Sequence, residues 1–199
     1  MQKIEFDSLI FEIFPEVYLP AEDSFFLANY SKNLKGRILE IGCGCGIASI
    51  ICAKNNPENI VYGIDISQKA VENSNHNAKL NDVKNVHFIN SDLFRNVFGK
   101  FDSIMFNPPY LPTSDEEKIN SVENYAYDGG KNGRKTIDLF LDNFERHLNE
   151  NGKILLIQSS LNDLDKTISV LKGKNFSVEI LDEESFFFEK LSILRAEKT

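Results

Sequence analysis

The sequence lacks the features that mark membrane-spanning, secreted and zinc-binding chains. No apolar run approaches the ~20 residues that a membrane-spanning helix requires, and the N-terminus alternates charged and apolar residues instead of showing a basic segment and an apolar leader. The three cysteines, Cys43, Cys45 and Cys52, lie close together, and no other His or Cys completes a zinc-ligand spacing. We therefore expect a cytoplasmic chain with reduced cysteines and no metal site.

Positive charge is also scarce. The chain has 22 basic against 30 acidic residues, a net charge of -8, and its lysines form no dense cluster. The average field repels a polyanion, so nucleic acid is a disfavoured partner. A hydrophobic fraction of 42% over 199 residues is typical of a globular chain, and we expect residues 1–199 to form one domain.

From Arg37 onward, short β-branched runs alternate with helix-compatible stretches, which is the pattern of a parallel sheet with helices on both faces. Strands are expected at Arg37–Ile41, Ile60–Ile64, Val86–Asn90, Asp102–Phe106, Lys153–Gln158, Ser177–Leu181 and Phe188–Arg195. Helices are expected at Ile47–Asn55, Gln68–Leu80, Gly133–Leu148 and Asp163–Lys172. The last two strands are joined by too few residues for a parallel crossover. We predict a doubly wound, Rossmann-like α/β fold whose seven-stranded sheet is parallel except for one antiparallel strand.

The first expected strand runs into Gly42-Cys43-Gly44-Cys45-Gly46. The glycines Gly42, Gly44 and Gly46 let the chain turn sharply and let a ligand touch its backbone, whereas a tight turn alone would need only one glycine. A dinucleotide-binding loop would have its third glycine where Ile47 stands. Together with the acidic Glu40 before the loop, this favours a cofactor with a charged amino-acid end over a nicotinamide.

Two further acidic residues follow the next two strands. Asp65 closes the second strand, with Ile66 beside it, where a carboxylate can accept both ribose hydroxyls. The alternative for Asp65 is an N-cap of the helix after Ser67. Asp92 follows the third strand and is placed to accept a hydrogen bond from an adenine amino group, with Leu93 alongside the ring. Taken alone, Asp92 would be an ordinary loop aspartate.

The fourth strand ends in Asn107-Pro108-Pro109-Tyr110, at the carboxyl edge where open α/β sheets bind ligands. Consecutive prolines make this segment rigid before any ligand arrives. The Asn107 side-chain oxygen and the Pro108 carbonyl could bind the two N–H groups of a planar amide or amine and aim its lone pair at a methyl sulfonium, with Tyr110 as a flat wall. A plain Asn-Pro turn is the alternative.

These two motifs resemble those of the HemK-type protein-(glutamine-N5) methyltransferases. Three further stretches are similar to the short archaeal and eukaryotic branch that methylates the Gly-Gly-Gln glutamine of class I release factors: 17–24 (Val-Tyr-Leu-Pro-Ala-Glu-Asp-Ser), 128–134 (Asp-Gly-Gly-Lys-Asn-Gly-Arg) and 188–194 (Phe-Glu-Lys-Leu-Ser-Ile-Leu). The resemblance implies S-adenosylmethionine as cofactor. It implies cofactor contacts from Ser24, Glu40, Gly42, Asp65, Asp92, Leu93 and Asn107, with Asn107 also holding the substrate.

The resemblance also bears on partners. The long bacterial members have an N-terminal helical domain, whereas this chain has an extension of residues 1–24 that we expect to contribute to the site. In the short branch a small zinc-binding protein commonly assists. In this fold the strand 86–90 is normally outermost, and it contains no proline or lysine, so we expect the partner to pair with it. Three alternatives stay open for the function: an adenine-N6 nucleic-acid methyltransferase, which the charge disfavours, methylation of another protein side chain, and a catalytically silent interaction module.

Overall fold

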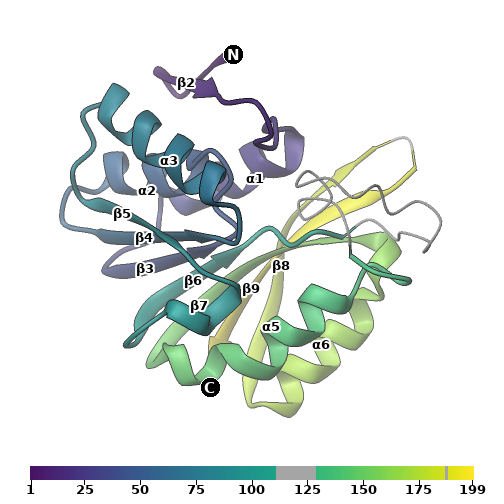
Figure 1. Ribbon diagram of the computed structural model, residues 1–199. Helices are drawn as coiled ribbons and strands as arrows, with labels where there is room; N and C mark the ends of the chain where they lie inside the picture. The colour runs from purple at the N-terminus through teal and green to yellow at the C-terminus, as the bar shows by residue number, and fades with distance from the viewer. Residues whose placement is uncertain (111–128, 187) are drawn as a thin grey trace.

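The computed structural model describes residues 1–110, 129–186 and 188–199. Its main element is a seven-stranded sheet with the order β5-β4-β3-β6-β7-β9-β8 (Figure 1). The strands are β3 (Arg37–Ile41), β4 (Ile60–Asp65), β5 (Val86–Asn90), β6 (Phe101–Phe106), β7 (Leu148–Ser159), β8 (Phe176–Ser185) and β9 (Lys190–Lys198). Neighbours from β5 to β7 are parallel, and β9 is antiparallel to both β7 and β8. The predicted fold class is confirmed.

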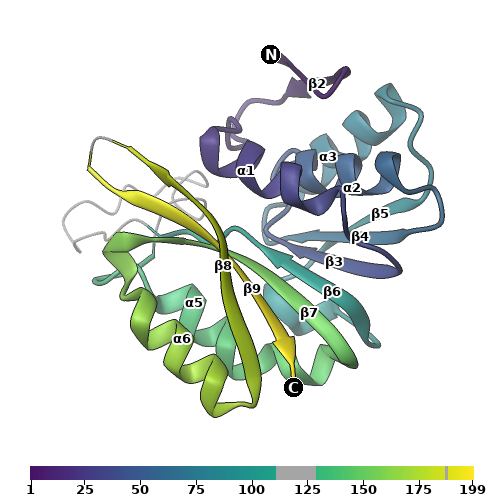
Figure 2. The ribbon, with the colours of Figure 1, turned by 180° about the vertical axis from the view of Figure 1, so that it is seen from behind.

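Helices cover both faces of this sheet (Figures 1 and 2). They are α1 (Glu22–Ser31), α2 (Ile47–Asn55) and α3 (Gln68–Leu80) on one face, and α5 (Lys135–Asn143) and α6 (Leu164–Gly173) on the other. Successive strand residues point to opposite faces, so Ile38 packs into the core under the first group and Leu39 into the core under the second. None of the helices among the described residues is long and apolar enough to cross a membrane.

Several expected boundaries were wrong. The last strand, expected at Phe188–Arg195, is β9 and runs from Lys190 to Lys198. The helix expected over Gly133–Leu148 is α5 followed by the 3-10 turn η2 (Phe144–His147), and β7 begins at Leu148, not at Lys153. The early part of β7 pairs irregularly with β6, with a register shift between Phe101 and Ser103. Its sequence therefore lacks the regular alternation of apolar and polar residues that indicates a strand. The stretch expected to connect the last two strands belongs largely to β8, which continues to Ser185. Its polar residues are tolerated because β8 is an exposed edge.

The N-terminal segment forms a separate antiparallel hairpin of β1 (Gln2–Phe6) and β2 (Leu9–Ile13) beside α3. Three asparagines one helical turn apart, two on α3 and one at its C-cap, accept backbone N–H groups of this segment. Asn73, Asn77 and Asn81 accept those of Phe14, Glu12 and Ile10 at 2.9–3.0 Å. Asn73 and Asn81 also donate to the carbonyls of Glu12 and Ile10. The helix thus pairs with β2 as a neighbouring strand would, and this asparagine ladder fixes the hairpin to α3.

Candidate active site

The glycine loop between β3 and α2 has a backbone that requires its glycines. Gly42, Gly44 and Gly46 have φ of 68°, 55° and 86°, in the left-handed region. A Cβ on Gly44 would meet nothing within 4 Å, whereas one on Gly46 would come within 3.0 Å of Phe88 and Ser74. The loop is therefore closely packed against Phe88 and Ser74 at Gly46 and open at Gly44. Ser74 and Asn77 of α3 support it by donating to the carbonyls of Gly44 and Cys45.

Glu40, one residue before the end of β3, is buried at the start of α2. Its Oε2 accepts the Ser49 backbone N–H at 2.9 Å and also the Ser49 hydroxyl. It thereby satisfies one of the N–H groups that a helix N-terminus leaves unpaired. Burial raises the pKa of Glu40 to about 8 from its ordinary 4.5, against the opposing effect of the Ser49 hydrogen bonds. Because burial disfavours the ionised carboxylate, a ligand ammonium group beside Glu40 would stabilise that ionised form.

Asp65, at the end of β4, supports the glycine loop directly. Its Oδ2 accepts the Gly44 N–H at 2.9 Å and its Oδ1 accepts the Ser67 N–H at 2.8 Å. The side chain that caps α3 is Ser67, which accepts from Ala70, so Asp65 is not the cap itself. Burial raises the pKa of Asp65 despite these two hydrogen bonds. Each carboxylate oxygen retains a lone pair with which it can accept a ligand hydroxyl.

The remaining expected cofactor residues lie at the ends of neighbouring strands. Ile66 is 45% exposed and Asp92 is exposed. Leu93 has a φ of 43°, an uncommon conformation for a residue with a side chain, at the first position of the 3-10 turn η1 (Leu93–Asn96). Because β3, β4 and β5 are parallel neighbours, their carboxyl ends bring Glu40, Asp65 and Asp92 to one edge of the sheet.

Asn107 follows β6 at the same edge and is oriented by a residue that the sequence reasoning missed. Its Nδ2 donates to Oδ2 of Asp23 at 2.9 Å, and Asp23, in the first turn of α1, is 5% exposed. A carboxylate only accepts, so this contact fixes which way the amide points. The Asn107 Oδ1 is buried and has no hydrogen-bond partner in residues 1–110, 129–186 and 188–199. The only sequence signal for Asp23 was its place in the stretch 17–24 that is similar to the short branch, and no role was assigned to it there.

Tyr18, Ser24 and Tyr110 also contact Asp23, and the Tyr18 hydroxyl donates to its Oδ1 at 3.2 Å. The Tyr110 hydroxyl lies 3.5 Å from Asp23 Oδ2, and the Ser24 hydroxyl donates to Asp23 Oδ1 at 3.1 Å. Burial, followed by the charges of Asp23 and Glu189, raises the pKa of Tyr110, which keeps its hydroxyl protonated. In the motif over 128–134, Asp128 lies outside the described residues. The three cysteines are buried and free.

The family model and the curated relatives point to one family, and a solved structure shares the fold. Residues 13–187 match the family model described as methyltransferase small domain. A putative protein N5-glutamine methyltransferase of Methanocaldococcus jannaschii is 47% identical over 97% of this chain and 98% of its own length. A release factor glutamine methyltransferase of Thermodesulfovibrio yellowstonii is 34% identical over 71% of this chain and 53% of its own. The E. cuniculi Mtq2-Trm112 complex, described as responsible for methylating the eRF1 translation termination factor, includes a similar fold with a TM-score of 0.70 at 22% identity, covering 92% of this chain and 99% of that one.

Proposed function

Because the chain belongs to the methyltransferase small domain family, we propose that it uses S-adenosylmethionine to methylate the N5 side-chain amide of a protein glutamine. The glutamine is that of the Gly-Gly-Gln motif in a class I translation release factor. The names of the archaeal and bacterial relatives support this substrate, and the archaeal relative matches over nearly its whole length. The resemblance to the protein-(glutamine-N5) methyltransferases that the motifs suggested is confirmed.

One observation carries the chemistry: Asn107 Oδ1 is a buried acceptor that no donor among the described residues satisfies. The Nδ2 atom of the same amide donates a hydrogen bond to Asp23, so the orientation of the oxygen is fixed. A glutamine amide has two N–H groups and a delocalised nitrogen lone pair that makes it a poor nucleophile. Donation of one N–H to Asn107 Oδ1 and the other to the Pro108 carbonyl would fix the amide plane and hold the nitrogen toward the incoming methyl group.

The residues around the glycine loop fit S-adenosylmethionine. The space above Gly44 admits a ligand against the backbone, and the buried carboxyl of Glu40 lies at the adjoining strand end. We assign the ribose hydroxyls to Asp65, the adenine to Asp92, Leu93 and Ile66, and the amino-acid end to Glu40, with Ser24 and Asn107 near the methyl group. When bound, the cofactor supplies an electrophilic methyl. The protein orients the amide that receives it, without a metal or a covalent intermediate in this proposal.

The decisive experiment is mass spectrometry of a purified class I release factor after incubation with this protein and methyl-labelled S-adenosylmethionine. A mass increase of one methyl group on the Gly-Gly-Gln glutamine is expected, and Gln→Glu at that position is the matched negative control. Methyl transfer to DNA with none to the release factor would favour the adenine-N6 alternative. Absence of cofactor binding by calorimetry would favour the silent module.

We further propose that a small partner protein, zinc-binding in the related branch, pairs with the β5 edge. Among the described strands β5 has β4 as its single neighbour. The other edge of the sheet, β8, bears the four carboxylates Glu179, Asp182, Glu183 and Glu184 and a bulge after Ile180, features that oppose strand addition. β5 has neither, which supports it as the docking edge.

The test uses a residue on the outer face of β5. Phe88 is unsuitable, because its ring packs against Gly46 and Gly63, where an added Cβ would come within 3.0 and 2.6 Å of it. Ile89 points the opposite way and is 37% exposed, and Ile180 on β8 is a matched control at 41%. Co-purification with the small zinc-binding partner should be lost in Ile89→Lys and retained in Ile180→Lys. Equal retention by both variants would place the interface elsewhere.

A further inference from the structure

The segment 129–134 before α5 is a motif that the proposed reaction does not use. It forms a tight turn in which the Gly133 N–H donates to the Gly130 carbonyl at 3.0 Å and the Lys135 N–H donates to the Gly129 carbonyl at 3.0 Å. Gly133 has a φ of 66°. A Cβ there would overlap the side-chain nitrogen of Asn162 and the carbonyl oxygen of Tyr110. The turn therefore brings the chain against the end of the segment 107–110.

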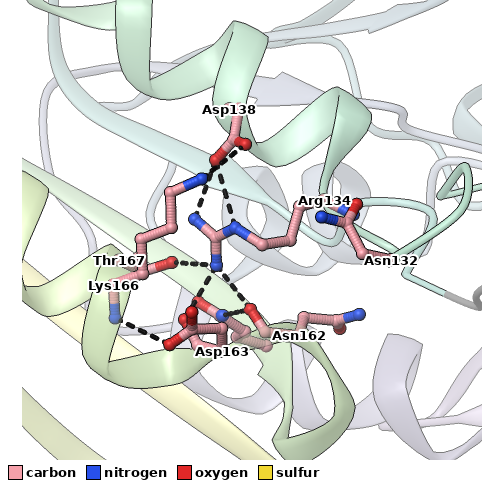
Figure 3. A network of polar contacts seen from close by, with 8 residues as sticks. Asn132, Arg134, Asp138, Asn162, Asp163, Lys166 and Thr167 are labelled. Atoms are coloured by element: carbon pink, nitrogen blue, oxygen red, sulfur yellow. Dashed lines mark hydrogen bonds and ion pairs between the residues drawn. The ribbon is translucent and has the colours of Figure 1, made fainter.

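Arg134, the last residue of this motif, is a buried charge at 2% exposure. Its guanidinium donates to Asp138 Oδ1 at 2.8 Å from Nη2, to Thr167 Oγ1 at 3.0 Å and to the Asp163 carbonyl at 2.8 Å, and it also contacts the Asn162 carbonyl. Figure 3 shows the guanidinium between Asp138 on one side and the turn at 162–163 on the other. A buried arginine needs such partners, and its planar fork fixes the groups that it binds.

Asn162 connects this network to the site. Its Nδ2 donates to the Tyr110 backbone carbonyl at 2.7 Å. Its own carbonyl is held by Arg134 and also accepts Gln158 Nε2 at 2.8 Å, so its position is set from two sides. While Arg134 and Gln158 donate to this carbonyl, the Asn162 backbone is restrained.

We propose that Arg134 is a positioning residue that acts through Asn162 to hold the Tyr110 carbonyl, and with it the segment 107–110; this proposal rests on the function proposed above. The segment is then fixed at both ends, by Asp23 on the Asn107 side chain and by Asn162 on the Tyr110 carbonyl. Between these ends lie two prolines with fixed φ, so a shift at Tyr110 is transmitted to the Pro108 carbonyl. A misplacement of about 1 Å can slow a reaction on the order of a hundred-fold.

The test compares Asn162→Ala, Arg134→Lys and the double variant in methylation of the release factor, with Lys166→Ala as control. Lys166 pairs with Asp138 on the outer side of the network. We expect Asn162→Ala to lower kcat by about ten- to a hundred-fold and to change the S-adenosylmethionine Kd by less than about two-fold. The double variant should be no slower than Asn162→Ala, since Arg134 acts through Asn162. Wild-type kcat in Asn162→Ala, or additive losses in the double variant, would overturn the proposal.

A second measurement separates this proposal from the choice of substrate. In protein labelled with 3-fluorotyrosine, Tyr110→Phe identifies the fluorine signal of Tyr110. That signal should shift or broaden in Asn162→Ala and stay in place in Lys166→Ala, whether or not the release factor is a substrate. An unchanged signal in Asn162→Ala would refute the positioning role, and so would a kcat loss matched by equal losses of cofactor affinity and thermal stability. Failure of the wild-type enzyme to methylate the release factor would refute the proposed function alone.

Discussion

Replacing Glu40 with glutamine should change how the stability of the protein depends on pH. The wild-type carboxyl has a pKa of about 8 when folded, against an ordinary 4.5, because it is buried. A raised pKa means that folding favours the neutral carboxyl. The contribution of Glu40 to the free energy of unfolding is therefore fully present below pH 4.5 and is lost as the pH rises through about 8. The interval spans about 3.5 pH units at about 1.4 kcal/mol each, so the loss is at most about 5 kcal/mol. Glutamine has the same shape and can still accept the Ser49 N–H, but it does not titrate.

The assay is urea unfolding of the wild type and Glu40→Gln without cofactor, from pH 5 to about pH 9. The free energy of unfolding of the wild type minus that of the variant should fall by about 1.4 kcal/mol per pH unit and level off above about pH 8. Other titrating groups are common to both proteins and cancel. Saturating S-adenosylmethionine should flatten the curve, because its ammonium group favours the ionised carboxyl. A difference that stays constant across this range would refute the account of Glu40.

Three further substitutions test the site. Asp65→Ala should weaken S-adenosylmethionine binding about ten- to a hundred-fold by calorimetry, since it removes a charged acceptor; unchanged affinity would mean that Asp65 only supports the loop. Asn107→Ala should slow single-turnover methylation on the order of a hundred- to a thousand-fold with a smaller effect on cofactor binding, and a wild-type rate would exclude the proposed role of its side-chain oxygen. Asp23→Asn should slow the same step about ten-fold, because a neutral amide holds Asn107 Nδ2 less strongly than a carboxylate does; an unchanged rate would show that Asn107 is oriented by other contacts.

The sequence predicted the positions of several strands well and the polar contacts poorly. Arg37–Ile41 and Val86–Asn90 were placed to the residue, because short β-branched runs bounded by turn residues have few other interpretations. Asp23 was not recognised as a partner of Asn107, since 84 residues separate them and only the tertiary fold brings α1 to the end of β6. The asparagines of α3 give no sequence signal either, because polar residues at helical spacing usually indicate a solvent-facing surface.

The asparagine ladder couples the exchange of backbone hydrogens at the N-terminus to the cofactor loop. The amide hydrogens of Ile10, Glu12 and Phe14 are bonded to α3, so deuterium reaches them only when the hairpin separates from that helix. The same helix holds the Gly44 and Cys45 carbonyls through Ser74 and Asn77, and Asn77 belongs to both sets of contacts. A movement of α3 would therefore break the contacts to the hairpin and to the loop together. We therefore expect a ligand bound at the loop to slow deuterium uptake in the hairpin, even where it touches none of the hairpin's residues.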